Sequence, residues 1–248
     1  MTKRINQTTI AAITFAALLC GTVHSSEAQI QRPRNGFALK APTTQEDIEA
    51  GKPNPQAPGF RIPLPPLDQM DAKMRADFES NAGNFHTPVG DRAPLLITPE
   101  VQAAYAVLQP ALLKTLIPQD LYELTILMAA REWSAQLVWW IHAPQGPSEG
   151  IPAEVVEAIR LGKLPKFSSP GQEATYHYMA QLLRDHDVDD ATYERLRAIV
   201  GTRQVVEMTV LAGYYGIVGA NDAAARIPMR SGVTPPLPPL KVRFPSAP

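Results

Sequence analysis

The sequence predicts an all-α fold made of a single helical domain. From Thr98 onward the apolar residues recur with a helical period, and the alternation typical of strands is scarce. The chain has 248 residues and 45% hydrophobic content, which is enough for one domain with a proper core. We therefore expect four segments: a signal peptide (1–28), a Pro-rich extended or disordered segment (29–66), the helical domain (67–230) and a Pro-rich tail (231–248).

The first residues are typical of a secretory leader. Lys3 and Arg4 precede an apolar run of eleven residues, Ile10–Cys20, which is too short to span a bilayer. A cleavage site after Ala28 would leave a chain that begins at Gln29. We therefore expect a soluble protein exported to the periplasm or the medium, rather than a lipid-anchored one.

Composition excludes several classes of partner. Without Lys3, Arg4 and Glu27 the chain keeps 21 basic and 23 acidic residues, so it offers no basic patch for nucleic acid. No second apolar run is long enough for a membrane span. The lone cysteine, Cys20, lies in the leader, and the four histidines of the mature chain lack metal-ligand spacing. We expect neither a disulfide nor a metal site.

The ends of the predicted domain are proline-rich. A helix is expected over Asp68–Ala82, followed by a loop over Asn81–Arg92 that contains His86 and could cover a pocket. The string Pro-Leu-Pro-Pro-Leu occurs at 63–67 and again at 236–240. We expect the second copy to be a stiff, solvated terminus in polyproline II conformation, with a docking arm as the alternative.

One stretch, from Glu123 to His142, combines polar heads with an apolar helical background. As a single straight helix it would place those two residues roughly 28 Å apart. Ser134 is a good N-cap, so we expect one helix from about Asp120 to Arg131 and a second over 135–143. Folded back on each other, the two helices would bring Glu123 and His142 toward one pocket.

These residues also have a simpler interpretation. A lone Glu in a helix is usually solvated, and a His near a helix end often interacts with the helix dipole. Trp133, Trp139 and Trp140 could serve only as core or interface anchors.

The same stretch resembles the signature of the carboxymuconolactone decarboxylase family. In that family a helix with Glu-Leu-x-Ile-Leu and a later Arg is followed by a helix with Trp-x-x-His. The matching residues are Glu123, Leu124, Ile126, Leu127, Arg131, Trp139 and His142. The resemblance covers roughly residues 94–228. It implies the alkyl hydroperoxidase D-like helical fold and a homo-oligomer, often a trimer or hexamer.

The resemblance also implies a chemistry. We expect cofactor-free acid–base catalysis, as in a carboxy-lyase, on a small organic acid or lactone. His142 would be the proton donor, and Glu123 would orient or reprotonate it. Arg131 would clamp a substrate carboxylate, while Trp133 and Trp139 would wall the pocket against water.

Two departures from the family keep other functions open. The dithiol positions of the alkyl hydroperoxidase D branch are occupied by Ala135 and Val138, so thiol peroxidase activity is not expected. The decarboxylase branch often has Glu where this chain has Val138. The alternatives are therefore a peroxidase-type member that has lost its Cys-x-x-Cys and a non-catalytic exported binding protein.

Overall fold

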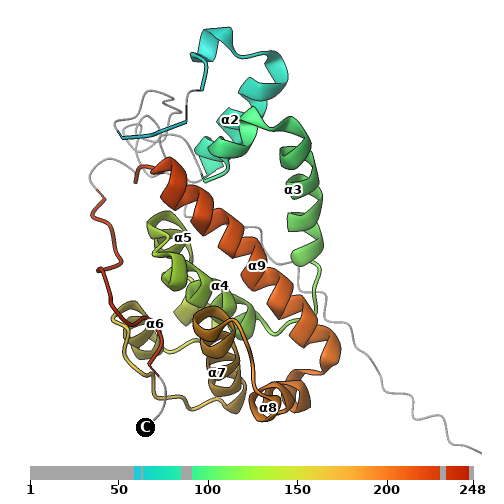
Figure 1. Ribbon diagram of the computed structural model, residues 1–248, viewed down its shortest axis with the longest axis vertical. Helices are drawn as coiled ribbons and strands as arrows, with labels where there is room; N and C mark the ends of the chain where they lie inside the picture. The colour runs from blue at the N-terminus through green and yellow to red at the C-terminus, as the bar shows by residue number, and fades with distance from the viewer. Residues whose placement is uncertain (1–58, 63, 85–90, 230–232, 246–248) are drawn as a thin grey trace, which may run out of the picture. The chain divides into compact units, whose positions relative to one another are not determined.

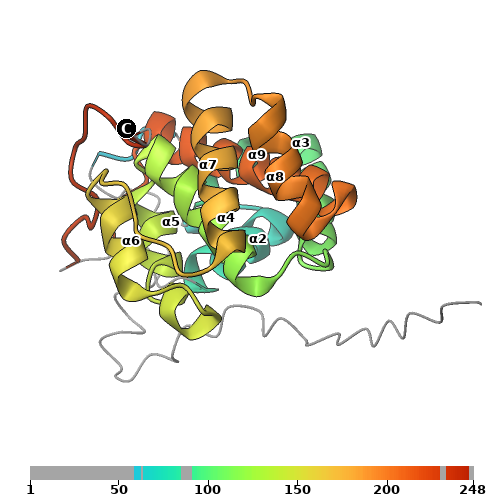
Figure 2. The same ribbon diagram turned by 90° about the horizontal axis from the view of Figure 1, so that it is seen from below.

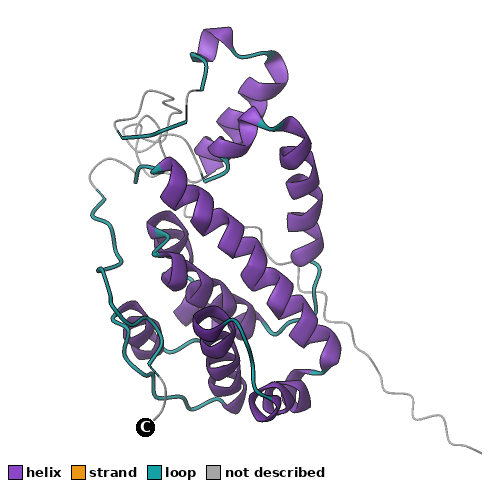
Figure 3. Ribbon diagram, in the orientation of Figure 1, coloured by secondary structure: helices purple, strands orange, loops and turns teal. Residues whose placement is uncertain are grey.

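The computed structural model describes residues 59–62, 64–84, 91–229 and 233–245, which all belong to one compact unit, 37–248 (Figure 1). The predicted all-α fold is confirmed, since these residues form helices and no strand (Figure 3). The signal peptide, most of the 29–66 segment and His86 lie outside the described residues. None of the described helices is both long and apolar enough to cross a membrane.

Eight α-helices and three short 3₁₀-helices follow one another in the described residues. The helix predicted over 68–82 begins only at Ala72, because Asp68 belongs to the first 3₁₀-helix instead. The elements are η1 (Leu67–Gln69), α2 (Ala72–Asn84), η2 (Ala93–Ile97), α3 (Pro99–Leu112), α4 (Gln119–Trp133), α5 (Gln136–His142), η3 (Gly146–Glu149), α6 (Ala153–Arg160), α7 (Pro170–Asp185), α8 (Asp190–Val200) and α9 (Thr202–Ala225).

Helix α4 is the centre of the core. Eleven consecutive residues, Leu121–Arg131, are buried, because α9, α7, α5 and α6 all pack against it (Figure 2). A helix that is apolar on every side is stable only when it is surrounded in this way. The two charged members of this run, Glu123 and Arg131, therefore need partners inside the protein.

The proline-rich C-terminal segment does not behave as a solvated terminus. Residues 233–245, called the strap below, are docked on the domain, with Leu237 and Phe244 almost fully buried. Gln136 exchanges two hydrogen bonds with the backbone of Leu237. Backbone carbonyls of the strap also accept hydrogen bonds from Arg131, Arg160 and Arg184. A polyproline segment has no internal hydrogen bonds, so its carbonyls are available to such donors.

Candidate active site

The turn between α4 and α5 brings Glu123 and His142 together, as predicted, but the turn is built differently from what we expected. Ser134 is not an N-cap: it ends α4 in the left-handed conformation, with φ 50°. The amide of Ala135 donates to Ala130 O (2.8 Å) and that of Ser134 to Arg131 O (3.1 Å), the pattern of a Schellman motif. The chain reverses within this turn, so α5 packs back on α4.

Glu123 and His142 form a buried hydrogen bond. Oε2 of Glu123 lies 2.8 Å from Nδ1 of His142, and the two side chains are 2% and 4% exposed. Glu123 is therefore not the solvated helix residue of the simpler interpretation. If the carboxylate is ionised it can only accept, and Nδ1 then carries the proton of this pair. This arrangement fixes the tautomer and directs Nε2 away from Glu123.

Tyr215 of α9 completes a chain of three polar groups. Its hydroxyl lies 3.2 Å from Nε2 of His142, and the two rings meet edge to face at 5.2 Å. Burial, with smaller contributions from Tyr122 and Glu123, holds the pKa of Tyr215 well above its ordinary value. The phenol therefore stays protonated and donates to Nε2 when the imidazole is neutral. Proton movement along Tyr215, His142 and Glu123 needs no rearrangement.

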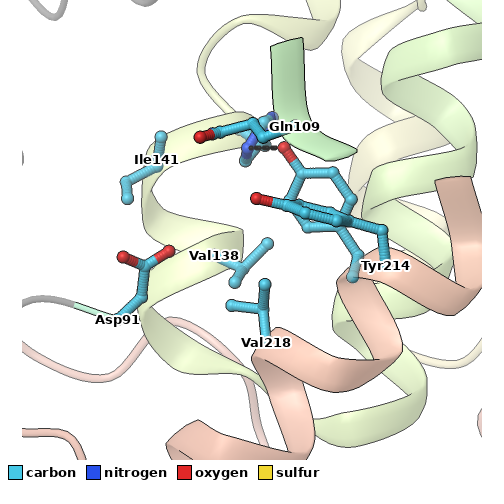
Figure 4. A pocket seen from close by; sticks show the side chains of 8 residues that line it. Asp91, Gln109, Val138, Ile141, Tyr214 and Val218 are labelled. Carbon is cyan, nitrogen blue, oxygen red and sulfur yellow. Dashed lines mark hydrogen bonds between the residues drawn. The ribbon is translucent and has the colours of Figure 1, made fainter. Parts of the chain in front are cut away.

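A small pocket opens beside this chain of groups (Figure 4). Val138 and Val218 lie between Asp91 and Tyr214 in that view. About 20 Å³ is open to the centre of a water molecule, which is room for one or two waters. The lining residues are Asp91, Gln109, Val138, Ile141, His142, Tyr214, Tyr215 and Val218.

Two acidic residues lie at or near the pocket, and burial affects the carboxyls of both. Asp91 lines the pocket, and burial raises the pKa of its carboxyl, while Arg92 and His142 oppose that shift. Asp222 lies one helical turn beyond Val218 on α9. Burial raises the pKa of Asp222 well above its ordinary value, and Asp91 adds to the shift. Neither oxygen of Asp222 has a hydrogen-bond partner among the described residues. Burial therefore shifts the pKa of both carboxyls upward, toward the protonated form.

The predicted substrate-binding residues lie elsewhere. Arg131, Trp133 and Trp139 are not among the residues that line the pocket. Arg131 points to the strap and donates to Pro238 O at 2.8 Å. Trp139 belongs to the hydrophobic core. Trp133 is 45% exposed and lies over Gly219 of α9, where an added Cβ would come within 2.5 Å of it. The structure thus joins Glu123 and His142 but gives the other three residues different surroundings.

Sequence reasoning missed the groups that complete the site. Tyr214 and Tyr215 interrupt an otherwise apolar stretch of α9, and that interruption was a usable signal. Asp91 and Gln109 carried no comparable signal, because each is a polar residue in a segment that could be solvated. Their place in the pocket depends on how η2 and α3 pack, and a single sequence does not give that packing.

No group of three or more His, Cys, Asp or Glu residues that could hold a metal ion is found in the described part of the chain. Comparison with known proteins adds no relative. No family model matches the chain, and no curated protein matches it. The resemblance to the carboxymuconolactone decarboxylases therefore rests on the motif residues alone.

Proposed function

We propose that this protein catalyses cofactor-free proton transfer on a small organic molecule, through Glu123, His142 and Tyr215. The observation that carries the proposal is the buried Glu123–His142 hydrogen bond of 2.8 Å with a phenol on the other ring nitrogen. Burial of three polar side chains in a fixed geometry costs stability, and such costs are typical of functional sites. The sequence resemblance suggests decarboxylation or lactone turnover as the reaction type.

The chemistry follows from the direction of the chain of groups. When a carboxylate leaves a substrate as carbon dioxide, the electron pair of the broken bond stays on carbon or its conjugated oxygen. That centre takes a proton from the donor at the pocket, which is the Tyr215 hydroxyl, or Nε2–H of His142 when the imidazole is in its cationic, doubly protonated form. Glu123 holds the imidazole in place and stabilises its cationic form during the transfer. Solvent then returns the proton to the site.

The lining favours an uncharged group in the pocket. The described residues that line the pocket include Asp91 but no Arg or Lys, and Arg131 is directed to the strap instead. An ionised substrate carboxylate would find no cationic partner among these lining residues, and an ionised Asp91 would also repel it. We therefore expect the lactone or carbonyl end of the substrate to enter. Arg92 does not line the pocket, but its Nη1 donates to the lining residue Gln109 (Oε1, 3.2 Å).

The pocket must widen before an organic molecule binds. Its present volume suits water, whereas a typical ligand pocket is several hundred cubic ångströms. Asp91 and Gln109 are only half-buried, so they are the lining residues that can move at least cost. Ligand binding should therefore change the environment of these two side chains first.

The test is a screen of the purified protein against small lactones and carboxylic acids with product detection. For any substrate found, His142→Ala, Glu123→Gln and their combination should each lose roughly a hundred- to ten-thousand-fold in turnover. Because the two residues share one proton-transfer step, the double variant should be little worse than His142→Ala. Tyr215→Phe keeps the ring and removes only the hydroxyl, so it tests the phenol alone.

The matched control is His177→Ala. His177 lies on α7, partly exposed and outside the pocket lining, so turnover should be unchanged. Each variant is checked by circular dichroism and melting temperature. Full turnover per folded molecule in His142→Ala would contradict the catalytic assignment.

A second candidate function is ligand binding without chemistry. Val138 lines the pocket at a position where one branch of the resembling family carries a cysteine and the decarboxylase branch often carries Glu, and valine can contribute neither a proton nor a thiolate. Calorimetric titration with the same compounds separates the two functions. A ligand that binds to the wild type, fails to bind to the His142→Ala variant and is never converted would favour the binding protein. Peroxide consumption driven by a thiol reductant would instead favour the peroxidase alternative.

We further propose a homo-oligomer, for which the surface offers a candidate interface. Helix α3 has one charged residue, Glu100, yet only Tyr105 and Leu112 of its side chains are buried. Val107 on α3 is 74% exposed, and α9 exposes Val206, Val210 and Ile217. An apolar helix left exposed marks an interaction surface. Light scattering after gel filtration should give a trimer or hexamer.

Substitution tests which surface is used. Val107→Glu and Val210→Glu should shift the protein to smaller species, because each buries a charge in the interface. Val242→Glu is the control, since Val242 is similarly exposed but lies on the strap. A monomeric wild type would remove the proposal.

The proposed export is tested by intact mass, which should correspond to a chain that begins near Gln29.

A further inference from the structure

Arg131 is buried and makes no salt bridge among the described residues. Its side chain is fully inaccessible, and of its three nitrogens only Nη2 has a partner, Pro238 O. Nε and Nη1 have no hydrogen-bond partner in the described chain. A guanidinium carries five N–H donors and stays charged in proteins, so leaving most of them unpaired in the interior is costly.

Further positive charge gathers at the same place. Arg160 donates to Pro236 O at 2.9 Å, two residues before the strap carbonyl that Arg131 contacts. Arg243 lies on the strap itself, 4.0 Å from the carboxylate of Glu132, and its buried Nε also lacks a partner among the described residues. Burial, then Arg243 and Arg160, lower the pKa of Arg131 to about 10.

The two carboxylates nearby do not resolve this imbalance. Glu157 is held by Nε and Nη2 of Arg160 at 2.7 and 2.8 Å. Glu132 reaches Arg243 only at 4.0 Å. The strap supplies carbonyl oxygens, which accept hydrogen bonds but carry no net charge. The unpaired donors of Arg131 and Arg243 therefore call for a negatively charged acceptor from outside the described chain.

We propose that Arg131 and Arg243 form a binding site for a small oxyanion, such as phosphate, sulfate or a carboxylate, at the strap. Oxygen anions match guanidinium donors in charge and in hydrogen-bond geometry. The side chain of Arg243 is 36% exposed, so an anion meets this arginine from solvent, whereas Arg131 is inaccessible and the anion reaches it only if the strap shifts. Neither arginine lines the His142 pocket, so this site is additional to the proposed proton-transfer site and does not depend on it.

An occupied site would tie the strap to α4. Arg131 belongs to α4 and Arg243 to the strap, so an anion that both arginines bind bridges two segments more than a hundred residues apart. Its binding stabilises the folded chain by linkage, since the unfolded chain does not hold the two arginines together. The melting temperature should therefore rise with anion concentration.

The experiment uses the full chain, with inorganic phosphate titrated against sodium chloride at constant ionic strength. We expect a saturable rise in melting temperature with phosphate and none with chloride. Arg243→Gln should weaken the apparent affinity for phosphate by about tenfold or more, the equivalent of one lost charged hydrogen bond. Arg243 is chosen because it is partly exposed, so the variant should fold.

Arg203→Gln is the matched control. Arg203 is 70% exposed on α9 and pairs with Glu207. Its replacement by Gln therefore changes the net charge of the protein by the same amount as Arg243→Gln, without affecting the strap. It should leave the phosphate response intact. The proposal would be overturned if phosphate did not raise the melting temperature of the wild type, if chloride raised it equally, or if the rise with phosphate were unchanged in Arg243→Gln. Sulfate and acetate in place of phosphate then distinguish a tetrahedral anion from a carboxylate.

Discussion

Replacing Gly162 by alanine should destabilise the protein through its contact with the strap. Gly162 follows α6 with φ +63°, where an L-residue costs about 1–2 kcal/mol. An added Cβ would also lie 2.7 Å from both Leu240 Cδ1 and the backbone oxygen of Val242. The leucine can rotate, but the carbonyl moves only if the strap moves, and such overpacking costs about 1–3 kcal/mol.

The total of about 3 kcal/mol should lower the melting temperature by about 6–12 °C for a domain of this size. Gly150→Ala is the control, because Gly150 has φ +96° but its nearest neighbour is 3.7 Å away. That variant should show the backbone cost alone. Urea unfolding gives both free energies, and limited proteolysis reports release of the strap. Equal losses in the two variants, with an intact strap, would refute the reasoning.

Three further predictions concern stability. Asp222 has a raised pKa when folded, so the folded state binds more protons and stability falls as pH rises above about 4. Asp222→Asn should abolish that loss, which denaturation at pH 4 and pH 7 would reveal as a flatter profile. Phe244→Ala should cost about 3 kcal/mol by leaving a cavity beside Tyr176, while Val242→Ala on the exposed side should cost under about 0.5 kcal/mol. Ser134→Gly should raise stability by up to about 1 kcal/mol in thermal unfolding, because glycine accepts φ 50° without strain.

Local signals predicted much of the fold. Helical periodicity and proline positions identified the helices, because those signals depend on residues close in sequence. The break between α4 and α5 was also predicted, yet the role given to Ser134 was wrong. A Ser between two helices can end the first or begin the second, and the choice depends on the backbone conformation, which the residue type does not fix.

Long-range packing could not be predicted in the same way. The Glu123–His142 contact followed from one reversal of the chain, whereas Tyr215 joins it from 73 residues away. The family resemblance led us to expect that Arg131 would clamp a substrate carboxylate. The sequence could not reveal that the acceptor is Pro238 O, since the carbonyl belongs to every residue and leaves no mark in the side-chain pattern.

The strap also has a consequence for how the chain folds. Gln136 and Leu237 are 101 residues apart, so their hydrogen bonds close a long loop after the helices have packed. Contacts that form after the transition state slow unfolding without speeding folding. We therefore expect the contacts of the strap to form late in folding, and their main effect should be to slow unfolding and so lengthen the lifetime of the native state.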